Sequence, residues 1–186
     1  MKDKLLYTTK ELFDSYLRGK YYTIPEYQRG YKWETKDIDC LLKDINNFSK
    51  NDDLDLFYCL QNITLVENKD SFNVVDGQQR LTTLAIILSY LGEYSLINEK
   101  IQYNIRKETE EFLKEYIYKS SNIKTIENWE QLLSISSLEN KDYDYQDVYY
   151  LFNAYKTVQS WFDSYPHKEP DMRDKVLNHI KIMLNY

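Results

Sequence analysis

The chain has 186 residues, of which 42% are hydrophobic and 29% charged, as is ordinary for a globular protein of one sizeable domain. No apolar run approaches the roughly 20 residues that span a membrane, and the first residues lack the apolar core of a signal peptide, so we expect a cytoplasmic protein without membrane contact. The 24 basic and 30 acidic residues give a net charge of −6, which argues against a large, sequence-independent contact with a nucleic-acid backbone.

The first third of the chain predicts a helix, a strand and a second helix. Thr8 and Glu11 form a capping-box pattern, and hydrophobic residues at helical spacing follow as far as Gly19. The β-branched and aromatic stretch "KYYTIP" predicts a short strand that ends at Pro25. From Thr35, hydrophobic residues at i, i+3, i+4 and i+7 predict a helix with one buried face.

The middle of the chain predicts a β-hairpin followed by a third helix. "LFYCLQNITLVE" and "SFNVVD" are typical of antiparallel strands, with a turn at Asn68 to Asp70 between them. After the connection Asp76 to Arg80, an apolar stripe begins at Leu81 and continues at helical spacing. From about residue 98 the pattern favours helices to the end, which comes at "IKIMLNY" without a cap and indicates a fragment of a longer protein.

The predicted fold class is therefore α+β. A small mixed sheet with helices occupies residues 1–97, and a helical part occupies residues 98–186. The two cysteines, Cys40 and Cys59, are flanked by apolar residues, so we expect buried, reduced thiols. His167 and His179 lie far apart without paired ligand spacing, which gives a zinc site little support.

The connection "DGQQR" passes directly from a predicted strand into a predicted helix, where free backbone N–H groups and the helix dipole favour an anion such as phosphate. Gly77 would let a ligand approach the backbone, and Arg80 would offer a fork of donors to phosphate. Thr82 and Thr83 add hydroxyls in the first helical turn.

Two kinds of side chain in this connection suit hydrolysis. Asp76 would bind Mg²⁺ or orient a water, and Gln78 or Gln79 would position the attacking water. A structural interpretation is equally compatible with these residues: Asp-Gly is a common turn, Arg80 could pair with Asp76 across it, and Thr82 could satisfy the helix start.

A second polar loop, "IPEYQRGYKWE", places Gln28 and Arg29 among three aromatic residues. This composition suits base stacking with a phosphate contact, and it equally suits a loop pinned to the core by its aromatic side chains. Because each loop follows a predicted strand, we expect the two loops to converge on one pocket.

The pair "YTIPEYQRGYKW" and "NVVDGQQRLTTL", with the later "FNAYKTVQSWF", resembles the amino-terminal domain of GmrSD-type, modification-dependent restriction endonucleases over essentially the whole chain. The resemblance implies a ParB/sulfiredoxin-like fold that binds and hydrolyses a nucleoside triphosphate (GTP, UTP, CTP or ATP) with Mg²⁺. It further implies restriction of phage DNA that carries modifications, with an HNH-type nuclease domain further along a longer chain. DNA would bind mainly through those other parts, and a homodimer is a further expectation.

Carried over by this resemblance, Asp76, Gly77, Gln78, Gln79 and Arg80 form the hydrolysing site, and Gln28 and Arg29 face it. Family members often have glycine in the strand before this motif, where this sequence has Gln61. The resemblance therefore does not determine the shape of this wall of the pocket. No HNH pattern occurs in these 186 residues.

Two other hypotheses belong to different classes. In one, the domain reads a DNA modification or nicks DNA and has no hydrolytic activity on nucleotides. In the other, both polar loops are internal hydrogen-bond networks of a scaffold, and a nucleotide would leave the melting temperature unchanged.

Overall fold

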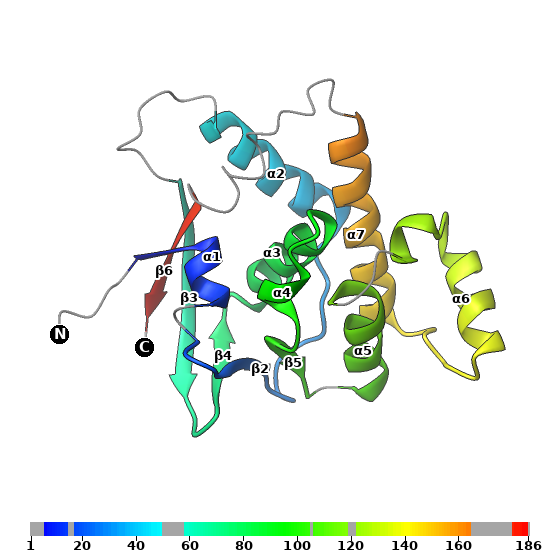
Figure 1. Ribbon diagram of the computed structural model, residues 1–186, viewed down its shortest axis with the longest axis horizontal. Helices are drawn as coiled ribbons and strands as arrows, with labels where there is room; N and C mark the ends of the chain where they lie inside the picture. The colour runs from blue at the N-terminus through cyan, green and yellow to red at the C-terminus, as the bar shows by residue number, and fades with distance from the viewer. Residues whose placement is uncertain are drawn as a thin grey trace.

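A computed structural model describes residues 6–14, 17–49, 58–104, 106–118, 122–164 and 180–185 (Figure 1). The predictions for His167 and His179 lie outside these residues. The fold is α+β, as predicted, with one mixed sheet of six strands in the order β1-β6-β3-β4-β2-β5. Its likeness to the ParB/sulfiredoxin fold stays a prediction.

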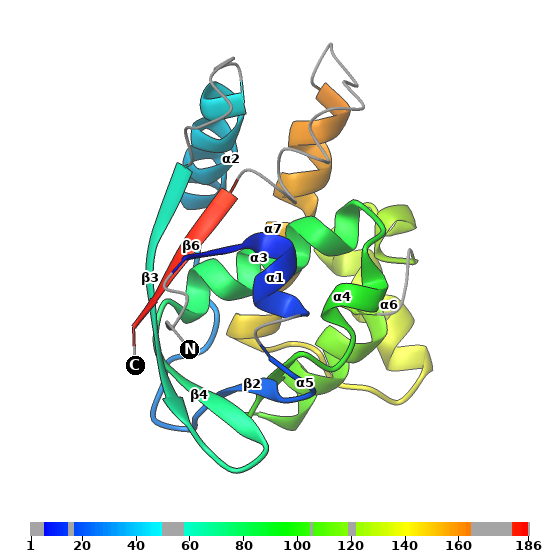
Figure 2. The ribbon, with the colours of Figure 1, turned by 60° about the vertical axis from the view of Figure 1, so that its left-hand side comes forward.

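The strands of the sheet are β1 (Leu6–Thr8), β2 (Tyr21–Ile24), β3 (Tyr58–Glu67), β4 (Ser71–Asp76), β5 (Ile101–Tyr103) and β6 (Ile180–Asn185). The helices are α1 (Thr9–Phe13), α2 (Thr35–Ser49), α3 (Gln78–Tyr90), α4 (Tyr94–Ile97), α5 (Lys107–Phe112), α6 (Trp129–Leu138) and α7 (Gln146–Ser164). A π-helical turn, η1 (Leu113–Ile117), continues α5, and a 3₁₀ turn, η2 (Asn122–Thr125), precedes α6. In both ribbon views α3, α4, α5 and α7 gather on one side of the sheet (Figures 1 and 2).

Three neighbouring strands of the sheet run parallel. β2 pairs in parallel with β4 on one side and with β5 on the other. The carboxyl ends of parallel neighbours lie at the same edge of a sheet, and this edge is where α/β proteins commonly bind ligands. The loops that follow β2, β4 and β5 therefore meet in space, although they are far apart in the sequence.

Helix α3 is buried on all its faces along most of its length, whereas the predicted apolar stripe implied one buried face. Every residue from Leu81 to Ser89 is buried, because the helix lies between the sheet and α7 and also contacts α4. Burial on all sides explains why the run "LTTLAIILS" contains no charged residue.

The start of the chain follows the predicted cap but not the predicted helix length. Thr8 Oγ1 accepts a hydrogen bond from the Glu11 N–H at 3.2 Å, and Glu11 Oε2 accepts one from the Thr8 N–H at 2.9 Å, so the capping box is confirmed. The helix ends at Phe13 rather than near Gly19. The chain turns instead into β2 through Arg18 and Gly19, which both have positive φ.

Two segments that were predicted to be helical are strands. Ile101–Tyr103 extends the sheet beside β2, and Ile180–Asn185 lies between β1 and β3. The hydrophobic pattern of such short segments fits either a helix or a strand. In both segments the backbone hydrogen bonds to a neighbouring strand decide in favour of the strand. Strands from both sides of the predicted division at residue 97 thus share one sheet, and the division itself stays a prediction.

The prediction of buried thiols was wrong. Cys40 is exposed on α2 and Cys59 is half-buried on β3, and both are free. Cys40 is exposed because α2 turns Ile38, Leu41 and its other buried residues toward the core.

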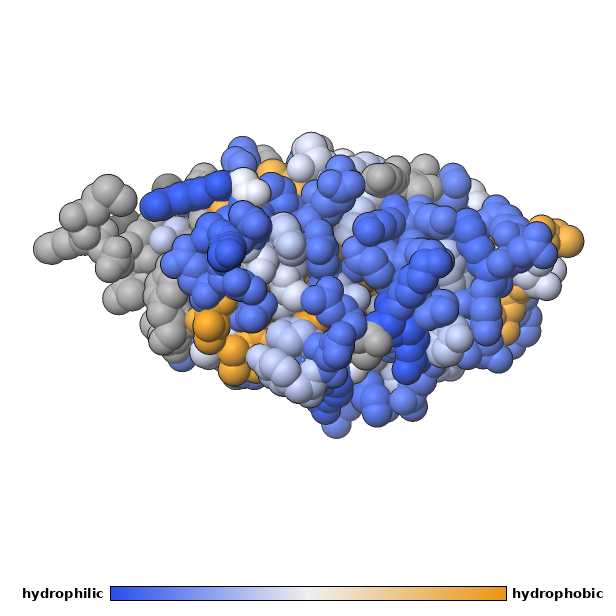
Figure 3. All heavy atoms as spheres, turned by 90° about the horizontal axis from the view of Figure 1, so that it is seen from below, coloured by the Kyte–Doolittle hydropathy of each residue, from blue (hydrophilic) through white to orange (hydrophobic). Residues whose placement is uncertain are grey.

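None of the described helices is both long and apolar enough to cross a membrane. From below, the molecule is mostly hydrophilic, with hydrophobic residues in small separate groups (Figure 3).

Candidate functional site

The two polar loops meet at the carboxyl ends of β2 and β4, as expected. Gln28 Nε2 donates a hydrogen bond to the Val75 carbonyl oxygen at 2.7 Å, and Gln78 Nε2 donates one to the Arg29 carbonyl oxygen at 3.0 Å. Val75 accepts the first bond at an irregularity in the pairing of β3 with β4, next to the end of the strand. These contacts join the "YQR" element to the "DGQQR" element directly.

Gly77 begins α3 in a conformation that only glycine adopts without strain. Its φ is +88°, and a Cβ added there would lie 3.0 Å from Ile63 Cγ1, 3.1 Å from Ile63 Cα and 3.2 Å from the Asn62 carbonyl oxygen. The close approach that Gly77 permits is therefore to strand β3. Its predicted approach to a ligand stays a prediction.

Gln79 forms hydrogen bonds to the backbone of the loop that follows β2. Its Oε1 accepts hydrogen bonds from the backbone N–H groups of Lys32 at 2.8 Å and Trp33 at 3.2 Å, while its Nε2 donates to the Gly30 carbonyl oxygen at 3.2 Å. The side chain is buried. Because Oε1 already accepts two hydrogen bonds, Gln79 holds the loop in place and has no free acceptor to orient a water.

The hydroxyls of Thr82 and Thr83 are also engaged inside the protein. Thr82 Oγ1 shares a hydrogen bond of 2.6 Å with the Tyr103 hydroxyl, and Thr83 Oγ1 shares one of 2.7 Å with the Tyr31 hydroxyl. Burial raises the pKa of both tyrosines well above the usual value, so both rings stay neutral. In the structural interpretation Thr82 satisfies the helix start, whereas its hydroxyl bonds to Tyr103 and no side chain caps α3.

Arg80 points back onto β3. Its Nη1 donates to Gln61 Oε1 at 2.9 Å and its Nη2 donates to the Asn62 carbonyl oxygen at 2.7 Å. The Asp76 carboxylate is 3.8 Å from Nη2, which makes a long ion pair across the turn. Nε of Arg80 is buried and has no hydrogen-bond partner among the described residues.

Gln61 has a backbone conformation that favours glycine. It has a φ of +65°, a left-handed conformation that residues other than Gly, Asn and Asp rarely adopt, at a bulge in the pairing of β3 with β6. In this chain the side chain at that position is used, because its Oε1 accepts from Arg80.

A smaller set of predicted residues faces solvent. The Asp76 side chain is 74% exposed, and Arg29 is exposed on the neighbouring loop. The first turn of α3 contains no acidic residue and no side chain caps it. Beside it, the Oε1 atom of Gln78 is buried and has no partner within the described structure.

Sequence reasoning missed two residues beside this site. A Cβ added at Gly30 would lie 2.8 Å from Cβ of Asp147, the buried second residue of α7, and Asp147 forms an ion pair with Arg106. The available signal was the strand-like triplet "IQY" shortly before Arg106, which was predicted to be helical.

Asp76 does not belong to an assembled metal centre. Within the described ranges, no three His, Cys, Asp or Glu side chains are grouped so that they could hold a metal ion. A single exposed carboxylate fits Mg²⁺, which commonly binds one or two carboxylates together with substrate phosphates and waters.

The family model described as "GmrSD restriction endonuclease, N-terminal domain" matches residues 9–186. Among curated proteins no sequence matches.

Proposed function

Because the chain belongs to the family of N-terminal domains of GmrSD restriction endonucleases, we propose that it is the domain of a DNA restriction protein that binds and hydrolyses a nucleoside triphosphate. Hydrolysis would regulate DNA cleavage by an HNH-type nuclease domain elsewhere in a longer chain, directed at phage DNA with modifications. A cytoplasmic location and a homodimer belong to the same proposal.

One observation carries this proposal. An exposed carboxylate, Asp76, and an exposed guanidinium, Arg29, flank the uncapped N-terminus of α3 at the carboxyl ends of two parallel strands. The positive end of a helix of 13 residues, with no acidic residue in its first turn, favours phosphate. The site thus combines an anion-binding element with a carboxylate that suits the cation of a metal nucleotide.

The exposed Arg29 and Asp76 and the buried Gln78 would divide the chemistry among them. Arg29 and the first amides of α3 would hold the phosphates and their developing charge. Asp76 would hold Mg²⁺, which when bound supplies neutralisation of the phosphate oxygens. The Oε1 of Gln78, which has no partner within the described structure, would accept a hydrogen bond from the attacking water and orient it.

The buried members of the motif support this arrangement indirectly. Gln79 fixes the backbone from Gly30 to Trp33, and Arg80 fixes the first turn of α3 on β3. Their role in hydrolysis would be to keep Arg29 and Asp76 in place, because catalysis depends on prior positioning of the charged groups.

The test is release of inorganic phosphate from ATP, GTP, CTP and UTP with Mg²⁺. We expect Asp76→Asn and Arg29→Ala to reduce turnover at least about a hundredfold, as the loss of one preorganised charged group commonly does. Asp70→Asn, which changes an exposed carboxylate on the hairpin turn, is the matched control and should leave turnover unchanged. Turnover equal to wild type in both site variants would contradict the proposal.

One observation favours the alternative of a DNA-modification reader or nicking module. Tyr27 is 72% exposed two residues from Arg29, so a ring and a cation are available for stacking on a base and contact with a phosphate. The net charge of −6 weighs against it. A gel shift with modified and plain DNA at several salt concentrations separates the two, since a reader discriminates between them and a nucleotide hydrolase does not.

A further inference from the structure

The three parallel strands share a feature beyond their common direction. β4, β2 and β5 are each followed within five residues by an arginine, namely Arg80, Arg29 and Arg106. β5 is held beside β2 in a fixed register, and just after it the Asn104 N–H donates to the Ile24 carbonyl oxygen at 3.1 Å. The segment that contains Arg106 thus leaves the sheet at the same edge as the two polar loops.

The guanidinium of Arg106 is fixed from two sides. Its Nη1 lies 2.9 Å from Oδ1 of Asp147, and its Cζ lies 4.7 Å from the centre of the Tyr145 ring. The other carboxylate oxygen of Asp147 accepts a hydrogen bond from the Thr109 hydroxyl. Because Asp147 is only 5% exposed, it is a rigid anchor for this arginine.

The same anchor touches the loop that contains Arg29. Gly30 does not have a positive φ, so its backbone conformation does not require glycine. What requires glycine is space, because a Cβ at this position would come within 2.8 Å of the Asp147 side chain. Asp147 therefore fixes Arg106 by an ion pair and the Arg29 loop by direct packing.

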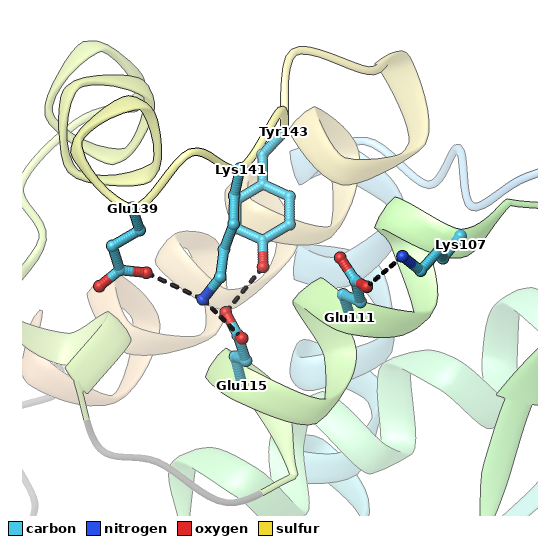
Figure 4. Close-up of polar contacts among 6 residues, drawn as sticks. All are labelled: Lys107, Glu111, Glu115, Glu139, Lys141 and Tyr143. Atoms are coloured by element: carbon cyan, nitrogen blue, oxygen red, sulfur yellow. Dashed lines mark hydrogen bonds and ion pairs between the residues drawn. The ribbon is translucent and has the colours of Figure 1, made fainter.

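Within the part of the chain that the structure describes, Arg106 keeps free N–H donors beside its ion pair with Asp147. Its side chain is 36% exposed and lines a hollow of about 470 Å³ at the end of β5. Of its five N–H donors, one on Nη1 is given to Asp147. Two neighbouring lysines in the hollow pair with glutamates, Lys107 with Glu111 at 3.2 Å (Figure 4) and Lys114 with Glu110 at 3.1 Å, so these cations are already neutralised.

We propose that Arg106 contacts the phosphates of the bound nucleotide from the β5 side, and that Asp147 and Tyr145 are positioning residues for it. The inference rests on the proposed function. Two inter-strand spacings, about 10 Å in all, separate the ends of β4 and β5. The outstretched side chain of an arginine and an extended triphosphate together bridge such a gap. A merely structural arginine would neutralise Asp147 and have no effect on phosphate affinity.

The test compares affinity for inorganic tripolyphosphate and for the four nucleoside triphosphates, measured by titration calorimetry. The double variant Arg106→Met/Asp147→Asn removes both charges, so that no buried carboxylate is left unpaired. We expect both kinds of ligand to bind about tenfold or more weakly, by the same factor, as loss of a charge-assisted hydrogen bond predicts. Lys107→Met/Glu111→Gln removes a charge pair from the same hollow and should leave both affinities unchanged.

The outcomes separate this inference from the proposed function. If wild type binds none of the nucleotides, the proposed function fails. If wild type binds and the double variant binds equally well, only the inference on Arg106 fails. Weaker nucleotide binding with unchanged tripolyphosphate binding would also overturn it, since Arg106 would then touch the sugar or base.

A second variant keeps the test decisive if the double variant does not fold. Arg106→Lys retains a cation beside Asp147 but loses the planar fork of donors. We expect it to weaken tripolyphosphate binding severalfold at an unchanged melting temperature. Affinity equal to wild type in this variant would overturn the inference.

Discussion

Two polar networks of the molecule differ in burial and in charge. At the carboxyl ends of β2 and β4, the buried amide of Gln79 and the buried hydroxyl of Thr83 connect α3 to the neighbouring loop. Between η1 and the segment before α7, Lys141 Nζ donates to Glu115 at 2.7 Å and Glu139 at 2.9 Å (Figure 4). Tyr143, which is buried, donates to the same Glu115 at 2.7 Å.

The difference in burial indicates how much each network contributes to stability. A buried amide that loses its partners leaves backbone groups without hydrogen bonds in a medium of low dielectric. The pKa of Lys141 is raised by its hydrogen bonds to Glu115 and Glu139, yet all three side chains are partly exposed, so water and salt screen the interaction. The uncharged network should therefore contribute more to stability than the charged one.

The largest effect is expected for Gly77→Ala. The new methyl group would meet Ile63 and Asn62 in a left-handed backbone, and strain and overpacking together should lower the free energy of unfolding by about 3 kcal/mol. Urea denaturation measures the change. Gly92→Ala is the matched control, because Gly92 has a φ of +83° but no atom within 4 Å of the added Cβ, and it should cost about 1 kcal/mol. Equal costs would show that the contact with β3 is unimportant.

Next comes Gln79→Met, which keeps the volume of the side chain and removes its three hydrogen bonds. We expect a loss of about 2 kcal/mol, since the N–H groups of Lys32 and Trp33 and the Gly30 carbonyl oxygen lose their partner. Gln78→Met removes one hydrogen bond and an unpartnered buried oxygen, so it should cost about 1 kcal/mol or less. A larger cost for Gln78 than for Gln79 would reverse the assignment of their roles.

The charged network should yield a smaller effect. Lys141→Met removes both ion pairs and should cost at most about 1 kcal/mol at low salt, as partly exposed pairs do. The cost should shrink further in 1 M NaCl, where screening acts within about 3 Å. Denaturation at both salt concentrations measures this. A cost above that of Gln79→Met would break the comparison between the two networks.

The smallest effect is expected for Gln61→Gly. Relief of the positive φ is offset by the lost hydrogen bond to Arg80 and by the greater freedom of glycine in the unfolded chain, so stability should change by less than about 0.5 kcal/mol. Gln61→Val is the contrasting variant, since a β-branched residue resists this conformation and should cost about 1–2 kcal/mol. Equal stability of the two variants would show that backbone strain at the bulge is negligible.

Local patterns in the sequence predicted local structure well. The capping box of Thr8, the hairpin around Asn68 to Asp70 and the helix that starts after Gly77 are all present, because neighbouring residues determine each of them. β5 and β6 could not be predicted in this way. Short apolar segments fit either a helix or a strand until a partner strand is available to pair with them.

The same limit applied to the candidate site. The sequence contained both Gln-Arg elements and supported the expectation that they meet. The family that these motifs resemble is the family whose model matches the chain. It did not distinguish Gln78 from Gln79, since neighbouring identical residues differ only in what each side chain contacts. Nor did it connect Arg106 and Asp147 to Gly30, because these residues lie on three separate elements.

By itself, then, the sequence determined the identity of the polar loops, the helices with clear periodicity and the central hairpin. The tertiary structure decided which polar groups are occupied inside the protein and which face solvent. The physical reason is that hydrogen-bond satisfaction and burial depend on contacts between distant segments, here through the parallel pairing of β4, β2 and β5. Only that pairing leaves Asp76, Arg29 and Arg106 at one edge of the sheet.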